Sequence, residues 1–554
     1  MNELLEKSNS ERVEFMKADV VLINGEVITV DQKNAVVEAV AIKDNQIVVV
    51  GSNQEVKSFI GENTDVIDLQ GKTLLPGFID SHLHIISHGL NQLAVSCKAE
   101  HIDSIDALLD DLKKKALETP KGEWIRAWGF NETAVEEKRY PTITELDEIS
   151  VEHPIIITRT CHHISVVNSK ALEIAQINEN TPDTSGGVIE KNQAGRLTGK
   201  LIEAANMSMS EVASYTESEM MKAVKIASDH FVAAGITSIH DAGGDGPESF
   251  RLLQRAVKSR DIRVRIYAMI CQINNSHEFV NKMVEAGVVT GTGDERFKVG
   301  PAKLFTDGSS TGPTIATRKS YSSDSNNYGI LYYSEEEIYQ VLGEAHKKGY
   351  QITVHAQGDK AIEMYLNCVE KALEESPRKN HRHRIEHAGI SSPDLQERMK
   401  KLEMIPIPNP PFPYEFGEIY VEHYGDRVNH MYAARDFIDR GIIAAGSSDA
   451  PVTDYNPLLG IHVAVNRKTK SGIEVGANQS ISVMEAIKLY TWNGAYASFE
   501  EEIKGSIEVG KLADLIILND SILSVNPNQI KDLKVETTII DGEIIYQKEQ
   551  SVKM

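Results

Sequence analysis

The sequence lacks the marks of several protein classes. Its 554 residues include only four cysteines, none in a Cys-x-x-Cys pair, so neither a disulfide framework nor a cysteine zinc site is indicated. No run of about 18 apolar residues is present that could span a membrane. Residues 1–20 are charged throughout, where a signal peptide would have an apolar core. These absences predict a cytoplasmic protein without a membrane partner.

Positive charge and phosphate-binding loops are also missing. The net charge is −23, and Lys and Arg do not gather in a basic stripe, so nucleic acid is a poor candidate partner. The glycine patterns GxGxxG and GxxxxGK[ST] are absent, which leaves nucleotide cofactors without support.

Two strand-rich segments lie at opposite ends of the chain, in residues 18–75 and 500–547. Both alternate Val, Ile and Thr with polar residues, as in DVVLINGEVITVD and VETTIIDGEIIYQ. Asn-Gly and Asp-Gly pairs between such runs are typical of hairpins. We expect one composite β-sandwich built from both segments.

The middle of the chain, residues 76–499, alternates strands with helices. Residues 334–349 have helical spacing and end on Gly, and the strand-like residues 350–359 follow. This alternation predicts parallel βα units, and hence an α/β protein with a (β/α)8 barrel. Residues 97–235 break the alternation and are too long for an ordinary loop, so we expect an inserted subdomain over the barrel mouth.

Several predicted barrel strands end in side chains that bind metals or protons. In LLPGFIDSHLH, His82 and His84 are two residues apart and share one face of a strand. Alone, each candidate could be a hydrogen-bonded histidine, an ion-paired lysine or a capping aspartate. Parallel strands bring their ends together at one face of a barrel, where imidazoles and carboxylates form a metal site. The remaining candidates are Lys303, His355, His387 and Asp449.

A second pair of histidines, His381 and His383, lies in NHRHR with an arginine after each. We interpret this pair as part of a solvated basic loop before a strand. Its replacement is therefore expected to change little.

The motifs together resemble one known family. The stretches LLPGFIDSHLH, TSIHDAG, AKLFTDGS, ITVHAQGDKAI, HRIEHAGI, GSSDAPV and GSIEVGKLADLIIL occur in order between about residues 18 and 547. In these stretches the chain resembles the metal-dependent amidohydrolase superfamily. The resemblance is to its amidohydrolase-3 branch, which includes YtcJ-like proteins and N-substituted formamide deformylases.

The resemblance implies a ligand set and a reaction. One or two divalent metals, with zinc expected, would activate a water, and Asp449 would accept its proton and pass it to the leaving amine. The bond cleaved would be an amide-type C–N bond of a small molecule, such as an N-acyl or N-formyl amine. By the same resemblance, His82, His84 and Asp449 hold one metal, His355 and His387 hold a second, and a CO2-derived carbamate on Lys303 bridges them. Without the carbamate, a single-metal site remains.

Two alternatives stay open at this point. The same residues could hydrolyse cyclic amides, imines or esters, and a protein of this fold could instead have lost catalysis and act in binding or regulation. A homodimer is expected from the family alone.

Further residues could contact the substrate. His163 precedes VNS in CHHISVVNSKAL, as a histidine of the family often does, and His240 ends the strand-like ITSIHDAG. Asp307 could orient a ligand or line the site. The aromatic candidates for the pocket wall are Trp128, Phe412 and Tyr432.

Overall fold

A sheet of seven parallel strands lies at the centre of the computed structural model, which describes residues 17–97, 102–159, 164–183, 187–244, 246–273 and 275–548. The sheet runs in the order β20-β19-β18-β17-β16-β15-β8, so that all neighbouring strands pair in parallel. The strands are β8 (Phe78–Leu83), β15 (Ile236–Asp241), β16 (Arg265–Ile270), β17 (Phe297–Phe305), β18 (Ile352–Ala356), β19 (Arg384–His387) and β20 (Ile405–Ile407).

Residues 442–450 take the place of the eighth strand. Ala445 N donates to Pro406 O of β20, while Ser81 N of β8 donates to Gly446 O, each at 3.1 Å. The backbone of Asp449 then continues along β8, because Asp449 N donates to His82 O at 2.8 Å. The sequence predicted a strand here. The segment is hydrogen-bonded to both neighbours but has no regular strand pairing, and it turns at Asp449, whose φ is 58°. The (β/α)8 barrel is thus confirmed.

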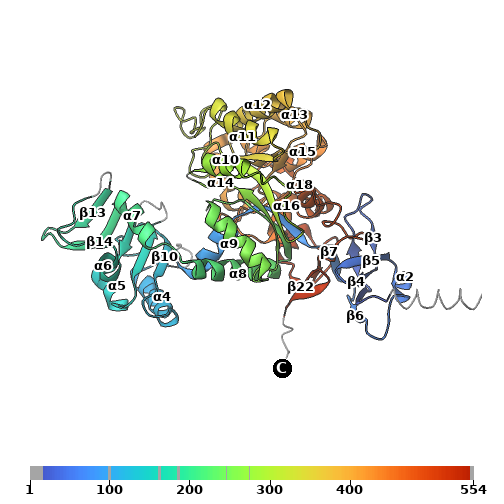
Figure 1. Cartoon of the computed structure of the whole chain (residues 1–554), viewed down its shortest axis with the longest axis horizontal. Helices are drawn as coiled ribbons and strands as arrows, with labels where there is room; N and C mark the ends of the chain where they lie inside the picture. The colour runs from blue at the N-terminus through green and yellow to red at the C-terminus, as the bar shows by residue number, and fades with distance from the viewer. Residues whose placement is uncertain are drawn as a thin grey trace, which may run out of the picture. The chain divides into compact units, whose positions relative to one another are not determined.

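Helices follow the barrel strands in sequence (Figure 1). Helix α11 shows why they form: Ser334 Oγ accepts from Glu337 N, Glu337 accepts from Ser334 N, and Ile338 and Leu342 are buried on one face. The helices are α9 (Gly246–Lys258), α10 (Ser276–Glu285), α11 (Glu335–Lys347), α12 (Asp359–Glu375), α13 (Pro393–Lys401), α14 (Phe412–Tyr424), α15 (Ala434–Asp439), α16 (Pro457–Asn466), α17 (Val483–Leu489) and α18 (Trp492–Ala497), with 3-10 turns η1 (Gly425–His430), η2 (Ala477–Gln479) and η3 (Pro527–Asp532).

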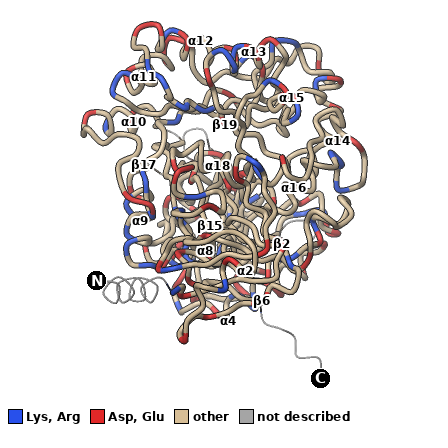
Figure 2. The backbone as a smooth tube through the Cα atoms, turned by 90° about the vertical axis from the view of Figure 1, so that its right-hand side faces the viewer, with Lys and Arg blue, Asp and Glu red and all other residues tan. Residues whose placement is uncertain are grey.

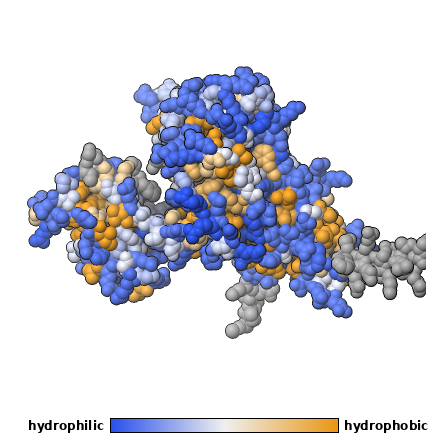
Figure 3. Space-filling model, viewed as in Figure 1, coloured by the Kyte–Doolittle hydropathy of each residue, from blue (hydrophilic) through white to orange (hydrophobic). Residues whose placement is uncertain are grey.

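The helices turn hydrophilic side chains outward. Figure 3 shows this polar surface over the region of α11 to α13 at the top of the view. Figure 2 shows Lys and Arg intermixed with Asp and Glu along the same helices. Among the described residues, no helix combines the length and apolar character needed to cross a membrane.

Strands from both ends of the chain form a composite β-layer. Leu515 and Ile516 of β21 pair with Pro76 and Leu75 of β7, so a late strand is bonded to an early one. The two sheets run β5-β4-β1-β6 and β23-β22-β21-β7-β2-β3 and share a core that includes Leu22, Leu74 and Ile539. This confirms the predicted composite sandwich. Its elements are β1 (Val20–Ile23), β2 (Glu26–Ile28), β3 (Val36–Val37), β4 (Ala39–Lys43), β5 (Gln46–Gly51), α2 (Asn53–Lys57), β6 (Asp65–Asp68), β7 (Thr73–Pro76), β21 (Leu515–Leu518), β22 (Val535–Ile540) and β23 (Glu543–Gln547).

A separate compact unit comprises Ile86–Ile226. Its sheet, ordered β13-β14-β12-β11-β10-β9, mixes parallel and antiparallel pairs and has its own apolar cores. The predicted position of the inserted subdomain over the barrel mouth stays a prediction. Its elements are α3 (Ile85–Leu93), β9 (Val95–Ser96), α4 (Ile105–Glu118), β10 (Ile125–Phe130), α5 (Ile143–Ile149), β11 (Ile155–Arg159), β12 (Ile164–Val167), α6 (Ser169–Ile174), β13 (Gly187–Lys191), β14 (Leu197–Glu203), α7 (Ala204–Val212) and α8 (Glu217–Ala233), the last of which continues beyond the unit.

The expectation of a solvated loop at His381 and His383 is wrong. The two side chains are 3% and 0% exposed. Ile352 N donates to His383 Nδ1, His383 Nε2 donates to His346 Nδ1 at 2.9 Å, and His346 Nε2 donates to Ser376 O. The chain of bonds links β18, the residue that precedes β19, and α11. A sequence pattern does not reveal it because the partners are distant along the chain.

We therefore predict that His383→Ala destabilises the fold. It leaves the buried Ile352 N–H and His346 Nδ1 without partners, and each such loss costs about 1–3 kcal/mol. The free energy of unfolding, measured in urea, should fall by at least that much. His277→Ala, which removes an exposed histidine on α10, is the matched control. An unchanged midpoint for His383→Ala would contradict the buried chain.

Stability should also fall in acid. Burial lowers the pKa of His346, and lowers that of His383 well below its usual value. In the unfolded chain both titrate near about 6.5, so below that pH the unfolded state binds more protons. The free energy of unfolding should decrease as the pH falls from 7 towards 5, and less steeply in His383→Ala. Urea titrations at several pH values test this, and parallel curves for both proteins would refute it.

Candidate metal centre

The imidazoles predicted as ligands meet at the carboxyl ends of the barrel strands. The ring centroids of His82 and His387 are 4.7 Å apart, and those of His387 and His355 are 4.5 Å apart. One ligand atom from each of His82, His387 and Asp449 lies within 4.8 Å of the other two. His84 joins them, with Nε2 3.3 Å from Asp449 Oδ1. Strands β8, β18 and β19 and the eighth-strand segment thus bring five of the candidates together.

His82 carries a nitrogen that is ready to bind a cation. Its Nδ1–H donates to Glu386 Oε2 at 2.5 Å, and its buried Nε2 has no hydrogen-bond partner among the described residues. Burial, with the charge of Lys303, lowers the pKa of His82 well below its usual value. The ring is therefore neutral, with its lone pair on Nε2. A buried nitrogen without a partner is costly unless a ligand uses it.

The other three histidines are held in the same manner. His84 Nδ1 donates to Gly243 O at 2.7 Å, His355 Nε2 donates to Gly308 O at 2.9 Å, and His387 Nδ1 donates to Asn409 Oδ1 at 2.7 Å. In His355 and His387 this bond fixes the tautomer and leaves the opposite ring nitrogen available, whereas Nε2 of His84 is directed at Asp449 Oδ1, and this contact raises the pKa of His84. Metal-binding histidines are usually held in this way by a carboxylate or carbonyl oxygen. The donor set fits a divalent transition metal such as zinc.

Glu386 is kept ionised beneath His82. Burial would raise the pKa of Glu386, but Arg384 and Lys303 hold it below its usual value. Arg384 donates through Nε and Nη2 to the two carboxylate oxygens at 2.8 and 2.9 Å, and Thr353 Oγ1 adds a bond at 2.7 Å. The charged carboxylate makes His82 a stronger ligand and sets its orientation.

Asp449 is the carboxylate of the cluster. Burial would raise its pKa, but the bond from His84 and the nearby His387 and Lys303 hold it below the usual value. Asp449 and His387 both have a left-handed backbone, with φ of 58° and 70°. This conformation is unfavourable for residues with a side chain and is found preferentially at functional sites. It turns both side chains towards the cluster.

Lys303 lies fully buried in β17. Its Nζ donates to Ala242 O at 3.2 Å and lies 5.0 Å from the Phe305 ring centroid. Its charge is one of the causes that shift the pKa of His82 and Asp449. The carbamate on this amine stays a prediction.

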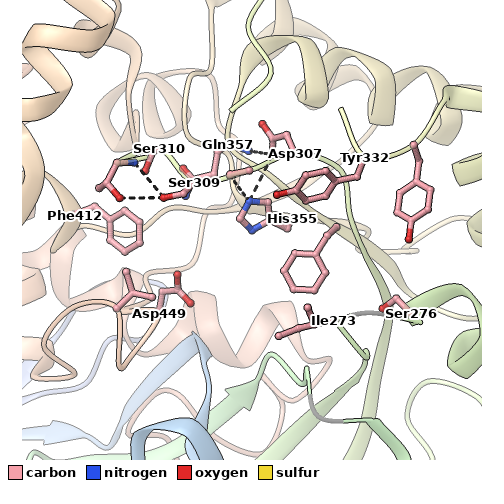
Figure 4. A pocket seen from close by; sticks show the side chains of 15 residues that line it. Ile273, Ser276, Asp307, Ser309, Ser310, Tyr332, His355, Gln357, Phe412 and Asp449 are labelled. Carbon is pink, nitrogen blue, oxygen red and sulfur yellow. Dashed lines mark hydrogen bonds and ion pairs between the residues drawn. The ribbon is translucent and has the colours of Figure 1, made fainter. Parts of the chain in front are cut away.

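A cavity of about 550 Å³ opens at the cluster (Figure 4). His355, Asp449 and Gln357 project into it together with the hydroxyl-bearing loop 309–311. Its lining includes no Lys or Arg in the part of the chain that the structure describes. Its apolar wall consists of Ile273, Phe305, Tyr332, Phe412 and Val452, together with Tyr333.

The residues predicted to contact the substrate lie in different parts of the structure. Asp307 lines the cavity and accepts from the backbone N–H groups of Gln357, Gly358 and Ala316, and burial raises its pKa to about 7. His240 is fully buried against Arg384, with 2.9 Å between its Nδ1 and Nη1, and does not line the cavity. Trp128 lies on β10 in the unit Ile86–Ile226, and His163 lies outside the described residues. Substrate contacts of the last two stay predictions.

Sequence reasoning missed four polar residues at the centre: Arg384, Glu386, Asn409 and Gln357. A signal for the first two was present, because alternation places Arg384 and Glu386 on one face of β19. A charged pair on a strand that must be buried indicates an internal ion pair. Nothing local distinguishes Asn409 or Gln357, since their partners are far along the chain.

Comparison with known proteins agrees with this geometry. The sequence pattern of the amidohydrolase family matches residues 65–546. The chain belongs to this family. The amidohydrolase is 32% identical to YtcJ of Bacillus subtilis (strain 168) over 92% of this chain and 96% of YtcJ. The assignment of YtcJ itself as an amidohydrolase is provisional.

Two further relatives extend the comparison. The chain is 28% identical to the N-substituted formamide deformylase of Arthrobacter pascens, over 96% of this chain and 98% of the other. Its structure resembles an uncharacterized metal-dependent hydrolase from Pyrococcus horikoshii OT3, with a TM-score of 0.77, 26% identity, and coverage of 92% and 99% of the two chains. This amidohydrolase is thus a metal-dependent hydrolase by family and fold.

His82→Ala should lower the amount of metal that the purified protein retains. The variant removes the ring whose free nitrogen lies in the buried cluster, and loss of a ligand weakens metal binding. Elemental analysis after dialysis, with His277→Ala as the control, measures the effect. Undiminished metal in a folded His82→Ala protein would show that the cluster is not the binding site.

Proposed function

We propose that this amidohydrolase cleaves the C–N bond of a small, neutral amide, such as an N-formyl or N-acyl amine. The observation that supports the proposal is the ionised Asp449 at the cavity wall, in contact with His84 and beside three histidines, His82, His355 and His387, that each keep one ring nitrogen available. A carboxylate next to a cation site is suited to moving a proton between water and a leaving amine.

The residues divide between two metal positions in this proposal. A divalent metal would supply Lewis acidity and lower the pKa of a water to about 7. We propose zinc, with one or two ions for each chain. His82, His84 and Asp449 would hold one ion, and His355 and His387 the other, with a carbamate on Lys303 between them.

Asp449 would serve first as the base and then as the acid. Its lowered pKa keeps it ionised at neutral pH, so it can accept a proton at Oδ1 or Oδ2. The same proton can then pass to the nitrogen of the departing amine. Phe412 and Tyr332 both line the cavity and would exclude water from the substrate.

The wall also favours one class of substrate. The described lining residues offer aromatic and aliphatic contacts but no cationic partner for a substrate carboxylate. A neutral amide with an apolar substituent would bury that substituent without leaving a charge unpaired. N-acyl amino acids fit this wall less well. The similarity to an N-substituted formamide deformylase agrees with the choice of a C–N bond.

Asp449→Asn should lower kcat by about 10²–10⁴-fold, the usual contribution of a general acid–base group. The test measures amine release from N-formyl amines, N-acyl amino acids, cyclic ureides and esters by zinc- and manganese-loaded protein. Each assay is repeated with a chelator. We expect chelator-sensitive hydrolysis of neutral amides by the wild type and its loss in the variant. If the metal-loaded wild type leaves the whole panel intact, the proposed function is wrong.

A further inference from the structure

The side chain of Gln357 has one polar group that the protein itself does not use. The residue is only 3% exposed. Its backbone N donates to Asp307 Oδ1 at 3.0 Å, and its backbone O accepts from Ile390 N at 2.7 Å. Its side-chain Oε1 accepts from the hydroxyl of Tyr432 at 3.0 Å. Among the described residues, no acceptor is bonded to its Nε2.

Tyr432 determines which way the amide of Gln357 faces. The Tyr432 hydroxyl lies in a buried group of hydroxyls, 3.3 Å from Tyr420 OH and 3.4 Å from Ser310 Oγ, and Tyr432 is itself 1% exposed. Because the hydroxyl occupies Oε1, the two N–H groups of Nε2 are left for the cavity that Gln357 lines. Because the side chain lines the cavity, these two N–H groups can donate to a bound ligand.

The position of Gln357 along the chain brings this donor to the metal cluster. Gln357 comes directly after β18, two residues beyond His355, and both side chains line the cavity. Figure 4 shows Gln357 and His355 side by side at the cavity that also contains Asp449. The backbone bonds to Asp307 and Ile390 hold Gln357 in place.

We propose that Gln357 Nε2 donates a hydrogen bond to the carbonyl oxygen of the bound amide and stabilises the negative charge that develops there during hydrolysis. Tyr432 is the positioning residue that keeps the donor aimed. The inference rests on the proposed function and adds a neutral donor that no titration can remove. A fixed donor of this type contributes more in the transition state than in the ground state.

Gln357→Met provides the main test, because methionine has a similar length and volume but no donor. With N-benzylformamide as the probe, kcat/KM should fall by about 10²–10³-fold, the loss typical of removing one such donor. The loss should lie mainly in kcat, with KM little changed, because the bond matters most in the transition state. Retained metal should equal that of the wild type. Gln254→Met, at an exposed glutamine of α9, is the matched control.

Tyr432→Phe tests the positioning role. Alone, it should lower kcat less than Gln357→Met does. In the Gln357→Met background it should lower kcat no further, because its effect acts through the missing amide. A merely structural tyrosine would instead reduce kcat by the same factor in both backgrounds, which would overturn its assigned role.

The outcomes separate the two proposals. If the wild type hydrolyses the probe and Gln357→Met retains its kcat/KM, or loses its metal together with its activity, the inference fails and the proposed function stands. If the metal-loaded wild type hydrolyses neither the probe nor any other amide of the panel, the proposed function fails and the inference fails with it.

Discussion

The buried ion pair between Arg384 and Glu386 is the interaction on which the barrel interior depends. Arg384 is bonded to Glu386 within β19, to Ser81 O of β8 at 2.6 Å and to His240 of β15. One guanidinium therefore joins three strands, two of which, β19 and β8, are not neighbours in the sheet. Removing one partner of such a buried pair costs about 3–5 kcal/mol, because a charge is left uncompensated. The pair thus stabilises one arrangement of the strands, and that arrangement determines where His82 points.

The metal centre depends on barrel closure just as strongly. Asp449 comes from a segment without regular strand structure, yet its N–H is bonded to the carbonyl oxygen of His82. Asp449, the predicted ligand from the last barrel segment, is thereby hydrogen-bonded directly to His82, the predicted ligand from the first barrel strand. The left-handed backbone at Asp449 and His387 is tolerated because surrounding hydrogen bonds and packing hold it. Fold stability and ligand geometry are therefore linked through the same few backbone bonds.

Much of the architecture could be predicted from the sequence because it follows from short-range patterns. Alternation of strand and helix signals predicted the barrel, and the β-rich ends predicted the sandwich that β7 and β21 now share. The strand-end positions of His82, His355 and Asp449 were enough to predict that they meet. Features that depend on distant partners could not be predicted. His383 is buried because of His346 and Ile352, and the amide of Gln357 is oriented by a tyrosine 75 residues away.

The pairing of β21 with β7 has a consequence for the order of events during biosynthesis. More than 400 residues separate these two strands, so β7 emerges from the ribosome long before its partner exists. The early strands β1 to β7 must wait with an unpaired edge while the barrel is being made. Chains of this size commonly fold through intermediates that expose such edges. We expect the sandwich to be among the last parts to form. The yield of folded protein should then depend on how well the β7 edge is shielded until β21 has been made.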